Sequence, residues 1–310
     1  MKRAGMMVMM LTLGVATLVL APLPAPALPM SPVAQAAASQ PAATQQAPAA
    51  PASPATPKRP PQAKTQPEFD AYQAAMANAQ DPAATEKAAD DFAGKFSDSE
   101  LRILLYRAAM HGYQGANNAD KMMGMGRKVL GIDADDPEAL IAVGEVLVER
   151  TKDTDLDKAQ RWDEATKLGQ HALQTIDTDL AIPANTPQEK VDDYKGYLRS
   201  SVYSILGAVE FNKEKFSDAE GYFRKSIDAY PAQPDPVVVL RLALALDKQG
   251  RYADALKEAG KAVDLSQGNA ALSEPARRER DRLVQLTGGI PVPDATPPPG
   301  TTPNTATPKK

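Results

Sequence analysis

Between residues 68 and 288, apolar residues recur three and four positions apart and are interrupted by short polar turns. Side chains at this spacing share one face of an α-helix, whereas a half-buried β-strand would alternate apolar and polar residues. That alternation is missing from this part of the sequence. The pattern therefore predicts an all-α fold of amphipathic helices.

The helices are predicted to pair through small residues. In the clearest unit, Gly207 of a first helix and Ala219 of a second are small where the two helices would approach closely. Tyr203 and Phe223 would fill the space beside them, because protein interiors are closely packed. Pro231 would end the second helix, since proline cannot continue one.

The same unit recurs along the chain. Its first helices are anchored, in order, at Tyr72, Tyr106, Leu140, Tyr203 and Val239. The steps between these anchors are 34, 34, 63 and 36 residues. This arrangement resembles the tetratricopeptide repeat (TPR) family, whose units pair two antiparallel helices every 34 residues. The resemblance covers residues 68–270 and implies a right-handed helical-repeat solenoid of about five helix pairs.

The 63-residue step predicts two insertions in one unit. One lies between its helices, around residues 151–161, and the other begins at Asp177. Thr186 to Glu189 has the sequence of a capping box with proline in the first helical turn. A long helix is therefore predicted from there to about Asn212.

The regions on either side of the repeats differ in composition. Ser273-Glu274-Pro275 is predicted to start a charged helix that ends at Gly288 and caps the solenoid. Residues 289–310 are rich in proline and threonine, and residues 37–67 are rich in alanine, proline and glutamine. Both stretches have few large apolar side chains to bury, so they are predicted to be disordered. The solenoid is predicted to span residues 68–288.

The first 36 residues have the order of a secretory signal peptide. Lys2 and Arg3 precede an uncharged segment, residues 4–21, and Ala34-Gln35-Ala36 offers a cleavage site. The alternative is an uncleaved N-terminal anchor, because about 18 apolar residues can just span a bilayer. The sequence thus predicts a bacterial protein exported to the periplasm or beyond, with membrane contact only through this segment.

The predicted solenoid is acidic, with 38 Asp and Glu residues against 28 Lys and Arg residues. Such a surface repels phosphate backbones, and no basic stripe interleaved with aromatic residues offsets it. Nucleic acid is therefore not expected as a partner. The chain has no cysteine, which excludes a disulfide framework and thiol chemistry.

Residues suited to catalysis are sparse. Neither His111 nor His171 has a partner at metal-ligand spacing, and no G-x-S-x-G or H-E-x-x-H motif occurs. The chain is predicted to be non-catalytic and to use no cofactor. One acidic set resembles an EF-hand calcium loop: Asp153, Asp155, Asp157 and Glu164. Because Lys158 stands where that loop needs glycine, a solvated interhelical loop is the preferred interpretation.

The TPR resemblance implies that the first helices line a concave groove along which partners bind. Positions one and five residues after each anchor would face it: Gln73, Ala77, Arg107, His111, Ile141, Glu145, Ser204, Ala208, Leu240 and Leu244. The polar members could equally be ordinary solvated surface. The helix carrying Leu240 and Leu244 is apolar on nearly every side, which demands either burial or a partner.

These features predict a non-catalytic scaffold for protein–protein interaction in the cell envelope. The alternative is a carrier that holds a peptide or an apolar small ligand near Phe211, Leu240 and Leu244. Some TPR proteins grip a partner's terminal carboxylate with lysine, asparagine and arginine in adjacent repeats. Only Arg107 resembles that set, so this mode of binding is not expected.

Overall fold

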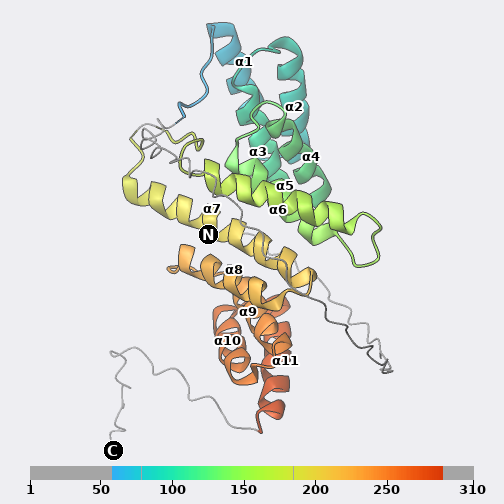
Figure 1. Cartoon of the computed structure of the whole chain (residues 1–310). Helices are drawn as coiled ribbons and strands as arrows, with labels where there is room; N and C mark the ends of the chain where they lie inside the picture. Colours follow the sequence, from blue (N-terminus) through green and yellow to red (C-terminus); the bar gives the residue numbers. More distant parts are fainter. Residues whose placement is uncertain (1–57, 78, 184, 289–310) are drawn as a thin grey trace, which may run out of the picture. The chain divides into compact units, whose positions relative to one another are not determined.

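The computed structural model describes residues 58–77, 79–183 and 185–288 (Figure 1). This part of the chain folds into eleven α-helices and contains no strand, which confirms the all-α prediction. In chain order the helices are α1 (Gln66–Met76), α2 (Pro82–Lys95), α3 (Arg102–Gly115), α4 (Ala119–Leu130), α5 (Pro137–Arg150), α6 (Lys158–Thr175), α7 (Gln188–Asn212), α8 (Phe216–Ala229), α9 (Pro236–Lys248), α10 (Tyr252–Leu265) and α11 (Ala270–Leu286).

Two predicted segments and most of a third lie outside the described residues. They are the signal peptide or anchor, residues 1–36, the tail, residues 289–310, and residues 37–57 of the predicted linker. Among the helices that the structure does describe, none has a stretch long and apolar enough to cross a bilayer.

The helices form five sequential antiparallel pairs, and α11 follows the last pair. Each helix packs mainly against its neighbours in the sequence, as expected of a TPR-like repeat. The five predicted anchors lie on the odd-numbered helices, one on each: Tyr72, Tyr106, Leu140, Tyr203 and Val239. The predicted arrangement of five pairs and a terminal helix is therefore confirmed.

Three helices begin with the same pair of residues, aspartate followed by proline. Asp81, Asp136 and Asp235 are the N-caps of α2, α5 and α9, and the side chain of each accepts a hydrogen bond from a backbone N–H in the first turn. The proline that follows lacks an N–H, and at the first helical position this costs no hydrogen bond.

Close packing between α7 and α8 depends on glycine, as predicted. A β-carbon on Gly207 would lie 2.6 Å from the ring of Phe223, which is fully buried. Gly144 of α5 also faces a neighbouring helix, because its β-carbon would lie 3.6 Å from Ile205 of α7. The small residues that recur along the sequence therefore mark true helix contacts.

The structure corrects the predicted start of α7. The helix ends at Asn212 as predicted and begins at Gln188, but no capping box forms. The hydroxyl of Thr186 donates to the carbonyl oxygen of Pro183 at 2.8 Å instead of accepting from the helix. Pro187 occupies the cap position and has no side chain that could accept a hydrogen bond.

Two other boundaries also differ from prediction. Helix α6 starts at Lys158, so the interhelical loop covers only residues 151–157 and the rest of the predicted insertion is helical. The terminal helix starts at Ala270, three residues before the predicted position, and Pro275 lies inside it. Proline at this sixth helical position removes one backbone hydrogen bond of the helix.

The folded part also begins before residue 68. The backbone N–H of Lys58 donates to the carbonyl oxygen of Thr178, and its ammonium group contacts Asp133 and Asp179. The guanidinium group of Arg59 makes two hydrogen bonds with Glu100, at 2.6 and 2.9 Å. The spacing of apolar residues could not predict these polar contacts, because residues 58–65 bury few apolar side chains.

Candidate functional site

Glu138, in the first turn of α5, joins three first helices. Its carboxylate lies 2.8 Å from Nε2 of His111 on α3 and accepts a 2.8 Å hydrogen bond from the hydroxyl of Tyr194 on α7. Burial alone would raise the pKa of Glu138, but the bond to His111 and the charge of Arg107 lower it. The same bond raises the pKa of His111, so this histidine gains a proton more readily than a free one.

Arg107 is held inside the same network. Its guanidinium group pairs with Asp136, whose side chain is fully buried, and its Nε lies 3.5 Å from Glu138. Asp136 also caps α5 by accepting from the N–H of Ala139 at 2.9 Å. Because breaking a buried ion pair leaves an uncompensated charge, we interpret Arg107 as a structural link between α3 and the start of α5.

Two exposed tyrosines of α7, Tyr194 and Tyr197, lie next to this network. The rings of Tyr194 and Tyr197 stack with centroids 6.4 Å apart, and the rings of Tyr197 and Tyr230 form a T-shaped pair with centroids 6.2 Å apart. Tyr194 is 37% exposed and Tyr197 is 48% exposed. Tyrosine is common in binding surfaces because it offers a large rigid ring with a polar tip.

Glu145, which acts on Tyr197, belongs to a group of three charged side chains that have no partner in the described part of the chain. Glu145 and Glu149 of α5 and Arg241 of α9 are partly buried. Among the described residues none of the three makes a hydrogen bond or an ion pair within 4.0 Å, although they act on one another over longer distances. Partly buried charges without partners are uncommon, because desolvation disfavours the charged form.

Burial explains the titration of these groups. It raises the pKa of Glu145 to about 7, with repulsion from Glu149 and Asp235 adding to the effect and Arg241 opposing it. Burial also raises the pKa of Glu149 and lowers that of Arg241. The surroundings therefore do not compensate the charges that these side chains carry.

We call this surface, which crosses α3, α5, α7 and α9 and includes the residue after the end of α8, the first-helix face. It consists of His111, Glu138, Glu145, Glu149, Tyr194, Tyr197, Tyr230 and Arg241. His111 and Glu145 were predicted as groove residues, and the structure places both here. Sequence reasoning missed the other six. Offsets from a repeat anchor could not find Tyr194 and Tyr197, because the long α7 extends past the end of a normal first helix.

The remaining predicted groove residues differ in their surroundings. Gln73 and Ala77 are exposed at α1, whereas Ile141 and Ala208 are buried and belong to the core. Leu240 packs on the cluster formed by Val239, Ala262, Val263 and Ala276, and Phe211 packs on another core cluster. Ser204 and Leu244 are partly buried. Leu240 and Phe211 thus contribute to packing between repeats, which leaves less apolar surface for a small ligand.

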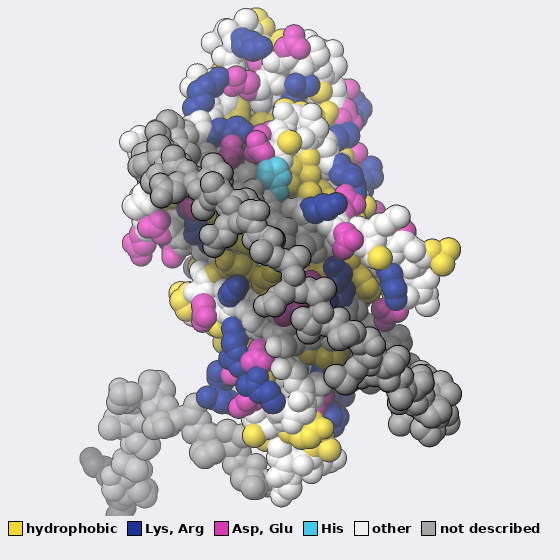
Figure 2. All heavy atoms as spheres, in the orientation of Figure 1, with side chains coloured by type: hydrophobic (Ala, Val, Ile, Leu, Met, Phe, Trp, Pro, Cys, Tyr) yellow, Lys and Arg dark blue, Asp and Glu magenta, His cyan; other side chains and the backbone are white. Residues whose placement is uncertain are grey.

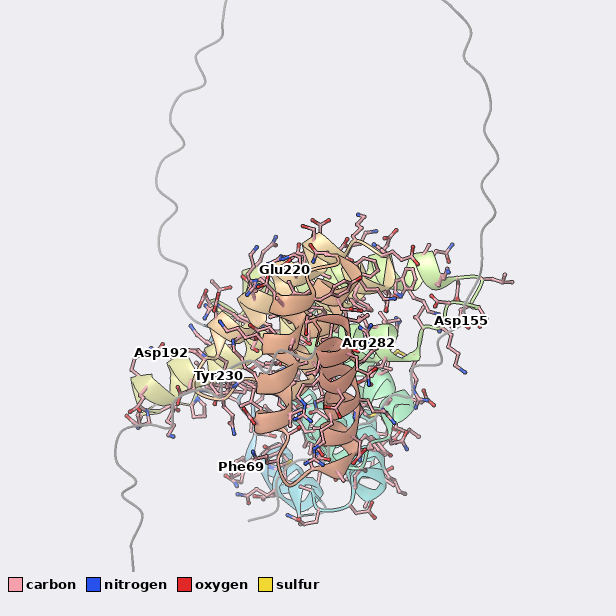
Figure 3. All side chains as sticks on the ribbon, turned by 90° about the horizontal axis from the view of Figure 1, so that it is seen from below. Phe69, Asp155, Asp192, Glu220, Tyr230 and Arg282 are labelled. Atoms are coloured by element: carbon pink, nitrogen blue, oxygen red, sulfur yellow. The ribbon has the colours of Figure 1, made fainter. Side chains whose placement is uncertain are left out.

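The acids of the suspected calcium loop pair with basic side chains instead of gathering around one point. Arg161 bonds Asp157 at 2.8 Å and lies 3.8 Å from Asp155, and Arg127 bonds Glu164 at 2.9 Å. Lys158 lies 3.9 Å from Asp153. Figure 3 shows Asp155 on a loop that projects from the helices. Within the described ranges no group of three or more potential ligands could hold a metal ion.

A hollow of about 570 Å³ lies elsewhere, between α2 and α4. Its polar groups already have partners, since Glu86 accepts from the hydroxyl of Tyr113 and from Lys121. Burial and this contact raise the pKa of Tyr113 to about 12. On the face seen in Figure 2, acidic and basic side chains are interspersed. Neither feature distinguishes a second binding surface.

No protein-family model matches the sequence, and no curated protein matches it. Solved structures match at low identity. TTC0263, a thermophilic TPR protein of Thermus thermophilus, is 12% identical over 68% of this chain and 98% of its own, with a TM-score of 0.44. PilF of Pseudomonas aeruginosa is 19% identical over 72% of this chain and 93% of its own, with a TM-score of 0.42. MamA MSR-1 C2 is 20% identical over 61% of this chain and 89% of its own, with a TM-score of 0.40.

Proposed function

We propose that this chain is a non-catalytic scaffold that binds another protein along its first-helix face. The single observation that carries the proposal is the set of exposed tyrosines and of charges without a described partner on α5, α7 and α9. A stack of paired helices presents such residues from successive repeats on one extended surface. Protein partners use surfaces of this kind through aromatic anchors surrounded by polar groups.

A photocrosslinking experiment tests the proposal. A photoreactive amino acid replaces Tyr197 on the first-helix face, and in a matched control it replaces Tyr252, which is 41% exposed at the start of α10. After illumination in the native cell, the Tyr197 variant should form a discrete adduct with another protein, which mass spectrometry identifies. Adducts of equal yield from both positions, or none from Tyr197, would remove the proposed surface.

The location of the protein is part of the same proposal. The positive start and the uncharged segment of residues 4–21 support export to the cell envelope. N-terminal sequencing of the protein from the periplasmic fraction should give a chain that begins near Ala37. A chain that begins at Met1 and stays with the membrane would favour the anchor, and a chain found only in the cytoplasm would overturn export.

A further inference from the structure

Several aromatic rings of the protein lie under a lysine, but in the described part of the chain Tyr194 and Tyr197 of the first-helix face do not. Lys128 lies 5.0 Å from the ring centre of Tyr106, and Lys225 lies 5.3 Å from that of Tyr222. Among the described residues, no such lysine or arginine covers Tyr194 or Tyr197. The faces of aromatic rings attract cations, so these two rings are open to a cation from outside.

The charged groups around Arg241 carry a net negative charge. Glu145, Glu149 and Asp235 are acidic, and Arg241 is the one basic group that acts on all three. A cation placed between Glu145 and Tyr197 would meet a carboxylate and the face of an aromatic ring together. An incoming anion would pair with Arg241 but would be repelled by all three acids.

The acids on this face are not all equally available. Glu138 already accepts hydrogen bonds from Tyr194 and His111, whereas Glu145 and Glu149 make none with described residues. Because Glu145 and Glu149 are four residues apart on α5, they lie on the same side of the helix. Cationic side chains would therefore bind beside Tyr197 and not at Glu138.

We propose that the surface formed by Glu145, Glu149, Tyr194 and Tyr197 binds an extended lysine- or arginine-containing segment of a partner protein. This inference rests on the proposed scaffold function and names the chemistry of its partner. One basic side chain of the segment pairs with the two glutamates, and another lies over the tyrosine rings. Electrostatic complementarity of this kind selects a partner and speeds its association.

Fluorescence anisotropy with labelled peptides tests the inference on the full chain. The probe is a twelve-residue peptide in which lysine alternates with alanine and proline, and its controls carry glutamine or glutamate in place of lysine. At pH 8, where Glu145 is ionised, the lysine peptide should bind about tenfold more tightly than the glutamine peptide. Equal binding of the two, or tighter binding of the glutamate peptide, would overturn the inference.

A pair of double variants separates this site from general charge. Glu145→Gln with Glu149→Gln should weaken binding of the lysine peptide about tenfold. Asp228→Asn with Asp264→Asn changes the net charge equally on α8 and α10. Both residues are exposed and form no ion pair with any residue that the structure describes, so this variant should leave binding within about twofold. An equal loss from both double variants would show nonspecific attraction and overturn the assignment.

Two further outcomes distinguish related possibilities. If Tyr197 crosslinks to a partner but the lysine peptide does not bind, the scaffold proposal stands and only the cationic partner is wrong. If the lysine peptide binds only after residues 289–310 are removed, the chain's own Lys309 and Lys310 occupy the surface, and the partner assignment is overturned.

Discussion

At the scale of single residues, Gly207 shows how closely neighbouring helices are packed. One of its α-hydrogens faces the ring of Phe223 so closely that no β-carbon would fit in its place without a shift of the ring or a helix. Phe223 is fully buried and packs with the cluster around Leu242, so the ring has little room to move. The lack of a side chain at this position therefore determines the distance between α7 and α8.

Gly207→Ala should destabilise the protein by about 1–3 kcal/mol, because the added methyl group overpacks this contact. Gly221→Ala is the matched control, since nothing lies within 4 Å of the β-carbon it would add to α8. Alanine in place of that helical glycine should stabilise by about 0.5–1 kcal/mol. Urea unfolding followed by circular dichroism measures both, and a Gly207→Ala variant as stable as wild type would disprove the close contact.

Glu145 should make stability depend on pH. The unfolded chain loses the Glu145 proton near the ordinary pKa of 4.5, whereas the folded protein holds it up to about pH 7. The contribution of Glu145 to stability is therefore fully present below its unfolded pKa of 4.5 and is lost as pH rises through its folded pKa of about 7. Glu145→Gln should raise the melting temperature at pH 8 by about 2–4 °C for each 1 kcal/mol recovered, and should change it little at pH 4. A gain at pH 4 that disappears at pH 8 would contradict this sign.

The residues of the candidate site show where sequence reasoning ends. His111 and Glu145 followed from their distance to a repeat anchor, and the structure places both on the first-helix face. Ile141 has the same kind of offset but is buried, since its surroundings depend on α7 and the long helix covers α5. The sequence could not show that Arg241 has no partner among the described residues, because this depends on which residues of other helices lie near it in the fold.

At the scale of elements, the small and large residues that recur along the chain were sufficient to predict five helix pairs and their order. Helix ends were predicted less well, because they depend on local hydrogen bonds that several residues can make. Thr186 could have capped α7 but bonds Pro183 instead. The apolar pattern likewise carries no information on residues 58–65, which the structure holds through Lys58 and Arg59.

The terminal helix α11 should contribute to stability through one face only. Leu283 is fully buried in the cluster shared with α9 and α10, whereas Leu286, three residues later, is 51% exposed. Leu283→Ala should cost about 2–5 kcal/mol through lost burial and the cavity that remains. Leu286→Ala should change stability by less than about 0.5 kcal/mol. Equal effects in thermal unfolding would show that α11 does not cover the end of the repeat stack.

At the scale of the whole molecule, most contacts join helices that are adjacent in the sequence. Helix α7 packs on α8, α6, α5 and α9 but makes no comparable contact with α1 or α2. In such an array the stability of each repeat depends on itself and its neighbours. A substitution that disrupts one repeat should therefore destabilise only the helices near it. The number of helices affected is a direct test of the repeat architecture.

Gly207→Trp provides that test by hydrogen exchange with mass spectrometry. The indole cannot fit beside Phe223, so α7 and α8 should exchange faster, and α5, α6 and α9 should follow because they pack on these two helices. Helices α1 and α2 should exchange at the wild-type rate. Gly221→Trp, placed where the β-carbon meets open space, should change none of these rates. Faster exchange in every helix of the Gly207→Trp protein would mean that the chain unfolds as one cooperative unit.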